Sequence, residues 1–315
     1  MSKLSVLVSL LILTSTLPAQ ITWSDYAANR TLTAATAETL AQKLTAGLTD
    51  PTEKAAAIYD WITHNIAYDV KLYEEVVSGR WKRRSYTPAE LQEVWDDRIR
   101  NTLKKRRGVC DNYARLYQRM AESVGLNCAY VTGYAKPNGL QANTLGQTHA
   151  WNAVEIDGEW KLVDATWGAG SLKMDGKFHQ DFRPGYFFSR PESLRYSHFP
   201  KDPEWQLLPD KITEAEFKLR PGVGAEFIRY GLGDLTENRY EISVPRGEDF
   251  VYRFTTAREI EGLVCANMTT RRQIDCAVER TAEGYAITVP EVKNMVFSLF
   301  VGAEDMLVSY RLRVR

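Results

Sequence analysis

Apolar residues recur with the spacing of an α-helix after Asp50, where Ile58, Ile62 and Ile66 repeat every fourth position. Asp50 can cap the first turn through its side chain. Pro51 suits the next position because proline lacks the N–H that a first turn leaves unpaired. The pattern predicts an amphipathic helix with one face on a core.

Two further segments have helical patterns. Residues 87–90 (Thr-Pro-Ala-Glu) form a capping-box sequence, which predicts a helix from there to about Lys105. From Cys110 the apolar positions again share one face until Gly125, which favours a helix end. The basic run 104–107 is typical of a solvated helix end, although a patch for an anionic polymer has the same composition.

The pattern then changes to strict alternation, which is typical of strands. Residues 128–135, 150–156 and 160–165 alternate, and Asp157-Gly158 lies between the second and third runs. An Asp-Gly pair in this position predicts a two-residue β-hairpin loop. Residues 166–210 lack a clear period, and we expect them to be irregular.

After Pro221-Gly222 the chain alternates in short runs that Gly, Pro and charged residues separate, at 239–244, 249–255, 285–289, 295–301 and 307–314. Several short strands without intervening helices predict an immunoglobulin-like β-sandwich over residues 220–315. Helices followed by an antiparallel sheet predict an α+β domain over residues 20–215.

The first twenty residues have the pattern of a secretory signal peptide. One lysine is followed by an apolar run of about fourteen residues and then by Pro18-Ala19-Gln20. We expect cleavage after Ala19, so that residues 1–19 are removed and the protein is exported to the periplasm or the extracellular space. A retained interfacial anchor is the alternative. No second long apolar run follows, so we expect no transmembrane span in the mature chain.

Composition limits the classes of possible partner but does not identify a particular one. The 315 residues include 40 basic and 40 acidic side chains, so no net charge favours nucleic acid. Cysteine and histidine lack the paired spacing of a zinc site, and no glycine-rich phosphate loop is present. We therefore expect no metal, no cofactor and no nucleic-acid partner.

The four cysteines fall into different settings. Cys265 and Cys276 lie in a β-like region, where a disulfide is feasible in an exported protein. Cys128 sits in an apolar run and is more typical of a core residue. Cys110 lies where a loop becomes a helix, and there the unpaired N–H groups and the positive end of the dipole favour a thiolate. The same N–H groups can bind a developing oxyanion.

The predicted hairpin gives Cys110 two partners. If Asp157-Gly158 is the loop, the residue numbers of two facing positions add up to 315. His149 and Asp164 then become diagonal neighbours on one face of the sheet, about 7–8 Å apart between backbones. An imidazole can bridge that gap, with one nitrogen toward the thiol and the other toward the carboxylate. Taken singly, His149 could be an ordinary sheet histidine and Asp164 a turn cap.

Three blocks of sequence resemble the transglutaminase-like superfamily, and within it the bacterial branch similar to the kyphoscoliosis peptidase. They are residues 108–114 (Gly-Val-Cys-Asp-Asn-Tyr-Ala), 148–152 (Thr-His-Ala-Trp-Asn) and 163–168 (Val-Asp-Ala-Thr-Trp-Gly). Flanking segments extend the resemblance to roughly residues 50–210. It implies a papain-like core, in which a helix carrying the cysteine packs on an antiparallel sheet carrying the histidine and the aspartate.

The resemblance also implies roles. Cys110 is then the nucleophile, His149 the general base and Asp164 the residue that orients it. Animal relatives stabilise the oxyanion with a tryptophan ahead of the cysteine, but neither Trp81 nor Trp95 can be aligned to that position. We list both as oxyanion or substrate-binding candidates, together with two aromatic residues of the later motifs, Trp151 and Trp167.

Together these features predict an exported enzyme that attacks a peptide, isopeptide or Gln amide bond through a Cys110 thioester. Hydrolysis is favoured over cross-linking, and the expected partner is a protein or peptide substrate, with cell-wall peptide among the candidates. The alternative from another class is a non-catalytic module that binds proteins or cell-wall material and retains the fold.

Overall fold

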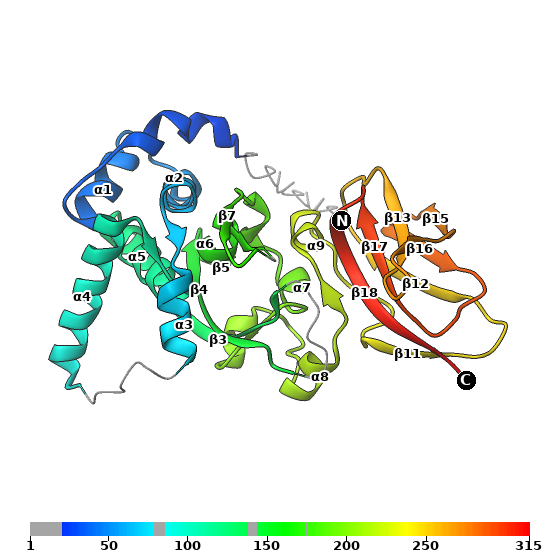
Figure 1. Cartoon of the computed structure of the whole chain (residues 1–315). Coiled ribbons are helices and arrows are strands. Elements are labelled where there is room, and N and C mark those ends of the chain that lie inside the picture. Colours follow the sequence, from blue (N-terminus) through cyan, green and yellow to red (C-terminus); the bar gives the residue numbers. More distant parts are fainter. Residues whose placement is uncertain (1–20, 79–85, 138–143, 174) are drawn as a thin grey trace, which may run out of the picture.

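The computed structural model describes residues 21–78, 86–137, 144–173 and 175–315. The predicted signal segment 1–19 and the candidate Trp81 lie outside these residues. Figure 1 shows the helices of the first half of the chain at one end, the β-rich C-terminal domain at the other, and strands β3, β4 and β5 between them. No helix in the described part of the chain is long and apolar enough to cross a membrane.

The N-terminal domain begins with a group of helices, and their caps are those that the sequence predicts. Asp50 caps α2 through the N–H groups of Thr52 and Glu53, and Thr87 forms a capping box with Glu90 at the start of α4. The elements are η1 (Trp23–Thr31), α1 (Ala37–Leu44), α2 (Pro51–Asn65), α3 (Val70–Val77), α4 (Pro88–Lys105) and α5 (Cys110–Ser123).

Helices α5 and α2 of this group pack on a five-stranded antiparallel sheet with the order β8-β5-β4-β3-β9. The central strands are β3 (Cys128–Ala135), β4 (Gln147–Ile156) and β5 (Glu159–Val163), and the outer ones are β8 (Phe187–Ser189) and β9 (His198–Pro200). Helix α5 lies against β4, so the helix that starts at Cys110 faces the strand that carries His149. The α+β core predicted from the sequence is confirmed.

The segment expected to be irregular, 166–210, instead contains short ordered elements. They are α6 (Ala165–Ala169), β6 (Gly170–Leu172), β7 (Phe178–Gln180), η3 (Pro184–Tyr186), β8, α7 (Pro191–Leu194), β9 and η4 (Pro203–Gln206). Each is five residues or fewer, too short to show a period in sequence. Strands β8 and β9 complete the two edges of the central sheet, so this segment belongs to the core of the first domain.

The second domain is a β-sandwich entered through α8 (Glu214–Leu219). One sheet has the order β10-β18-β17-β13-β14, with β11 also paired to β18, and the other has the order β12-β16-β15. The strands are β10 (Gly222–Val223), β11 (Glu241–Val244), β12 (Phe250–Thr255), β13 (Leu263–Asn267), β14 (Arg272–Gln273), β15 (Ala277–Arg280), β16 (Gly284–Val289), β17 (Met295–Val301) and β18 (Asp305–Val314).

Aromatic residues fill the space between these two sheets. Tyr252 of β12 lies 5.9 Å from Phe297 of β17 and 5.2 Å from Tyr310 of β18, measured between ring centroids. Cys265 of β13 and Cys276, which immediately precedes β15, form a disulfide that joins the sheets. The expectation of strands without helices is wrong at one point, because α9 (Ala225–Arg229) follows β10.

The two domains are joined by specific side-chain contacts around Tyr196. Its hydroxyl donates to the Asn238 side chain at 2.8 Å and accepts from the Leu235 N–H at 3.1 Å. Its ring packs against Phe227 of α9 at 5.2 Å. Since Tyr196 is fully buried and lies two residues before β9, the second domain is anchored close to the sheet of the first.

Candidate active site

Cys110 occupies the first position of α5 and is partly exposed. The preceding turn is held by Asn112, whose side-chain oxygen accepts a hydrogen bond of 3.0 Å from the N–H of Val109. Gly108 is required at this turn, since a Cβ there would lie 2.5 Å from the Cβ of Asn112. The local sequence therefore presents the sulfur at a helix start, beside backbone N–H groups that a first turn leaves unpaired.

A second backbone contact fixes the approach to Cys110. Strand β1 (Ala67–Tyr68) pairs in parallel with β2 (Arg107–Gly108), so that Tyr68 lies opposite Gly108. The N–H of Asp69 then donates to the carbonyl of Gly108 at 3.0 Å. The end of helix α2 is thereby tied to the turn that carries the cysteine.

The β4–β5 hairpin has the register expected from its loop. Ile156 pairs with Glu159 and Asn152 with Val163, so facing positions sum to 315. Asp157 and Gly158 both adopt positive φ, of 51° and 82°, as a type I′ turn requires. The ladder ends at Val163, so the next residue, Asp164, leaves the strand.

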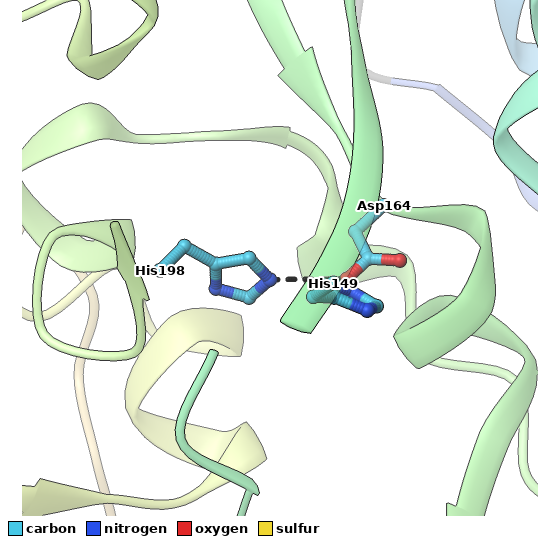
Figure 2. Close-up of side chains that lie close together, drawn as sticks. All are labelled: His149, Asp164 and His198. Carbon is cyan, nitrogen blue, oxygen red and sulfur yellow. Dashed lines mark hydrogen bonds and ion pairs between the residues drawn. The ribbon is translucent and has the colours of Figure 1, made fainter. Parts of the chain in front are cut away.

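His149 and Asp164 meet beyond the end of that ladder. The distance between His149 Nε2 and Asp164 Oδ2 is 2.7 Å, and the two side chains are only 2% and 1% exposed. Figure 2 shows the two side chains together, with Asp164 on the loop before α6. Since Nε2 is used by the carboxylate, Nδ1 is the ring nitrogen left for another partner.

Asp164 also caps helix α6. Its Oδ1 accepts hydrogen bonds from the N–H groups of Thr166, at 2.9 Å, and Trp167, at 3.0 Å. The capping role and the pairing with His149 were alternatives in the sequence, and the structure assigns one carboxylate oxygen to each. A carboxylate held at both oxygens has little freedom to rotate.

A third side chain, His198, completes this cluster. Its Nε2 lies 3.1 Å from Asp164 Oδ2, and its Nδ1 lies 2.8 Å from the hydroxyl of Ser197. Figure 2 shows the ring reaching Asp164 from the other side of His149. His198 is not among the residues predicted from the sequence, because it lies on β9, in the segment expected to be irregular.

The charges of the cluster follow from these contacts. Burial lowers the pKa of His149, but the charge and hydrogen bond of Asp164, followed by those of Cys110, raise it to about 10. Burial likewise raises the pKa of Asp164, yet His149 and then His198 bring it well below its usual range. Burial lowers the pKa of His198 despite Asp164. Near neutral pH, His149 is therefore a cation, Asp164 an anion and His198 neutral.

Cys110 and His149 open onto the same cavity, of about 340 Å³. Aromatic residues form much of its lining, and Arg183 places a guanidinium group there. Val223 and Ala225 of the second domain line it as well. The sulfur of Cys110 is near enough to His149 to raise its pKa. The cavity thus presents the sulfur of Cys110, an imidazolium and an apolar wall to whatever enters it.

The three tryptophan candidates that the structure describes lie in different places relative to the cavity. Trp167 lines the cavity, and its ring lies 5.3 Å from that of His149. Trp151 is 1% exposed, packs against both His149 and His198, and is not among the residues that line the cavity. Trp95 lies beneath the guanidinium of Arg115, at 4.0 Å from ring centroid to Cζ, and is not among the lining residues.

His149, Asp164 and His198 also have the donor atoms of a metal site. One ligand atom from each lies within 4.8 Å of the others. All three are buried, and the same atoms are already joined by the hydrogen bonds at Asp164. Hydrogen bonding accounts for the arrangement of the three side chains.

Comparison with known proteins agrees with the sequence motifs. Residues 38–165 match the model of the transglutaminase-like superfamily. The chain is 33% identical over 187 residues to kyphoscoliosis peptidase of Mus musculus, covering 57% of this chain and 25% of that protein. It is 28% identical over 208 residues to Hillarin of Drosophila melanogaster, covering 61% of this chain and 23% of that protein. The chain thus spans about a quarter of the length of these relatives.

Solved structures are also similar to the chain. A structure described as a TGase covers 52% of this chain and 37% of its own, at 18% identity and a TM-score of 0.31. A putative cysteine protease from Cytophaga hutchinsonii covers 50% of this chain and 46% of its own, at 22% identity and a TM-score of 0.28.

Proposed function

Residues 38–165 form a domain of the transglutaminase-like superfamily, and from that premise we propose that the protein is an exported, cysteine-dependent acyl-transfer enzyme. Cys110 is the nucleophile, His149 the acid and base, and Asp164 the residue that orients His149. The substrate is a peptide, isopeptide or Gln amide bond, cell-wall peptide included. The observation that carries the proposal is the shared cavity of Cys110 and His149, with Asp164 bonded to the far nitrogen of the ring.

The first half-reaction begins from a proposed ion pair of the Cys110 thiolate and the His149 imidazolium. The thiolate of Cys110 attacks the substrate carbonyl, and a carbon–sulfur bond forms as the carbonyl oxygen becomes an oxyanion. His149 gives its Nδ1 proton to the leaving nitrogen, the carbon–nitrogen bond breaks, and an amine or ammonia departs. The enzyme then holds a thioester, and His149 is neutral.

The second half-reaction resolves the thioester. Water attacks the thioester carbonyl while Nδ1 of His149 takes the proton from it. The carbon–sulfur bond breaks, the acid product leaves, and Cys110 returns as a thiolate beside the imidazolium. Throughout, Asp164 keeps the other proton on Nε2, so the ring cannot turn or change tautomer.

Hydrolysis is favoured over cross-linking by the character of the cavity. Cross-linking needs a lysine amine as the second substrate, and Arg183 at the cavity is a cation whose ion-pair partner, Asp181, lies 3.0 Å away with 58% of its side chain exposed. A cation repels a second cation in a partly desolvated site. Water carries no such penalty, so it is the expected acceptor.

Product analysis tests the proposal. Purified mature protein is incubated with a library of peptides, isopeptides and glutamine peptides, and free amine termini, ammonia and cross-linked products are measured separately. We expect free amines or ammonia from the wild type and from Cys128→Ala, the matched loss of a buried thiol, but not from Cys110→Ala. Equal product from Cys110→Ala and wild type would overturn the proposal in favour of a binding module.

A further inference from the structure

An oxyanion hole is built from more than one hydrogen-bond donor. At this site the backbone N–H groups at the start of α5 supply one donor, and a second donor has to come from elsewhere in the cavity. We propose that the hydroxyl of Tyr68 is the second donor. This inference rests on the proposed acyl transfer at Cys110 and adds a catalytic residue to it. Four observations carry it: the backbone position of Tyr68, its side-chain environment, its unengaged hydroxyl and the contrast with the tryptophans.

The backbone places Tyr68 beside the cysteine although 42 positions separate the two residues in the sequence. Tyr68 pairs with Gly108 in the short parallel ladder of β1 and β2, two residues before Cys110. The hydrogen bond from Asp69 to the Gly108 carbonyl, at 3.0 Å, closes the same ladder. A residue fixed to the turn that precedes the nucleophile moves with it, which is what preorganised catalysis requires.

The side chain of Tyr68 points into the cavity that contains Cys110. It is among the lining residues, and its ring lies 6.0 Å from that of Tyr73 and 6.3 Å from that of Phe178. Burial raises the pKa of Tyr68 well above its usual range, and nearby Cys110 raises it further. The hydroxyl therefore keeps its proton at neutral pH and can donate it to a hydrogen bond.

Three other tyrosine hydroxyls near the site already have acceptors, and Tyr186, which also lines the cavity, lies on the side of Asp164 with its ring against Trp167. Tyr59 donates to the carbonyl of Arg183 at 2.7 Å, Tyr73 donates to Gln147 at 2.8 Å, and Tyr113 donates to the carbonyl of Ile66. The Tyr68 hydroxyl makes no hydrogen bond to any residue that the structure describes. A half-buried donor without a partner, in the cavity of the nucleophile, is available to an oxyanion that forms there.

The tryptophans do not offer an equivalent group. Trp151 lies behind His149 and outside the cavity lining, and Trp95 is covered by Arg115. Trp167 follows Asp164 and lies on the His149 side of the cavity. Tyr68 instead approaches from the turn before Cys110, the side on which the helix N–H groups also lie.

The test compares a reaction that forms an oxyanion with one that does not. Hydrolysis of p-nitrophenyl acetate passes through a tetrahedral oxyanion, whereas alkylation of Cys110 by iodoacetamide does not. We expect Tyr68→Phe, which keeps the ring, to lower kcat for the ester about 10²- to 10³-fold, the usual cost of one oxyanion donor. The alkylation rate and KM should stay within about twofold of wild type. Tyr134→Phe, which removes a hydroxyl outside the cavity lining, should behave as wild type.

A second measurement does not depend on turnover. An amino aldehyde such as acetyl-phenylalaninal adds to the thiol as a tetrahedral hemithioacetal, and its affinity should fall in Tyr68→Phe in parallel with kcat. Unchanged kcat and aldehyde affinity in Tyr68→Phe would overturn the inference, as would an equal loss of the alkylation rate, which would place Tyr68 on the thiol itself. Wild-type ester hydrolysis no faster than that of Cys110→Ala would instead overturn the proposed function, and this inference with it.

Discussion

Asp164→Asn is the substitution whose consequences the geometry defines most closely. The new amide must still accept from the N–H groups of Thr166 and Trp167, so its oxygen takes the place of Oδ1. Its NH₂ group then faces His149 and His198 where Oδ2 was. A donor now meets Nε2 of His149, and the ring can satisfy it only by moving its proton to Nδ1.

That change of tautomer removes the base. With a proton on Nδ1 and no negative charge behind it, neutral His149 cannot accept a proton from Cys110 or from water. In a catalytic triad the wrong tautomer costs about 10⁴ in kcat, which corresponds to about 5 kcal/mol in the activation barrier. Asp164→Asn should therefore lower kcat about 10³- to 10⁴-fold, with a much smaller effect on KM.

The same substitution changes the dependence of stability on pH. Because the pKa of His149 is raised to about 10, its contribution is complete below the ordinary value of 6.5 and is lost as pH rises toward 10. Because the pKa of Asp164 is lowered, its contribution is present above the ordinary value of 3.8 and is lost as pH falls below it. Breaking such a buried pair typically costs about 3–5 kcal/mol.

Urea unfolding between pH 5 and 10, combined with ester hydrolysis, measures both effects. We expect the free energy of unfolding of wild type to fall between about pH 6.5 and 10. Asp164→Asn should be less stable than wild type at pH 6, and its free energy of unfolding should fall less over the same pH range. Turnover by Asp164→Asn within tenfold of wild type, or an alkaline limb as steep as that of wild type, would refute the reasoning.

Three further substitutions probe the surroundings of the site. His198→Phe removes a hydrogen bond to the Asp164 carboxylate and should lower kcat about tenfold or more. His198→Gln keeps a donor, so it should restore most of kcat and retain the deshielded His149 N–H proton in NMR spectra. Equal kcat in the two variants would contradict a positioning role for His198. Gly108→Ala should cost about 1–3 kcal/mol in thermal unfolding, because its Cβ would overlap that of Asn112, and an unchanged Tm would contradict this. Replacing Cys265 and Cys276 together by Ser should cost about 2–4 kcal/mol in urea unfolding of the second domain, and no loss of stability would show that the disulfide is not formed.

The pairing of His149 with Asp164 could be predicted because it depends on local structure. The Asp157-Gly158 turn sets the hairpin register as far as the pair of Asn152 and Val163, which brings the next residue, Asp164, close to His149. The helix starts at Pro51 and Pro88 were likewise predictable from the capping residues beside them, and the start at Cys110 from the apolar face that begins there.

The rest of the site depends on long-range pairing. His198 reaches Asp164 because β9 pairs with β3, some 65 positions earlier in the sequence. Tyr68 reaches the cavity through a two-residue parallel ladder, which leaves no period to detect. Val223 and Ala225 join the cavity only because the second domain docks against the first. Such contacts arise from tertiary packing, which single-sequence patterns do not encode.

The most direct test of the account is the capture of the acyl-enzyme. The protein is mixed with p-nitrophenyl acetate, quenched in acid within the first turnover, digested and analysed by mass spectrometry. The account predicts one acetyl group on Cys110 and none on Cys128, which is buried and whose pKa burial raises far above the usual range. Ester turnover without an adduct on Cys110, or equal labelling of both thiols, would contradict the claim that Cys110 is the nucleophile.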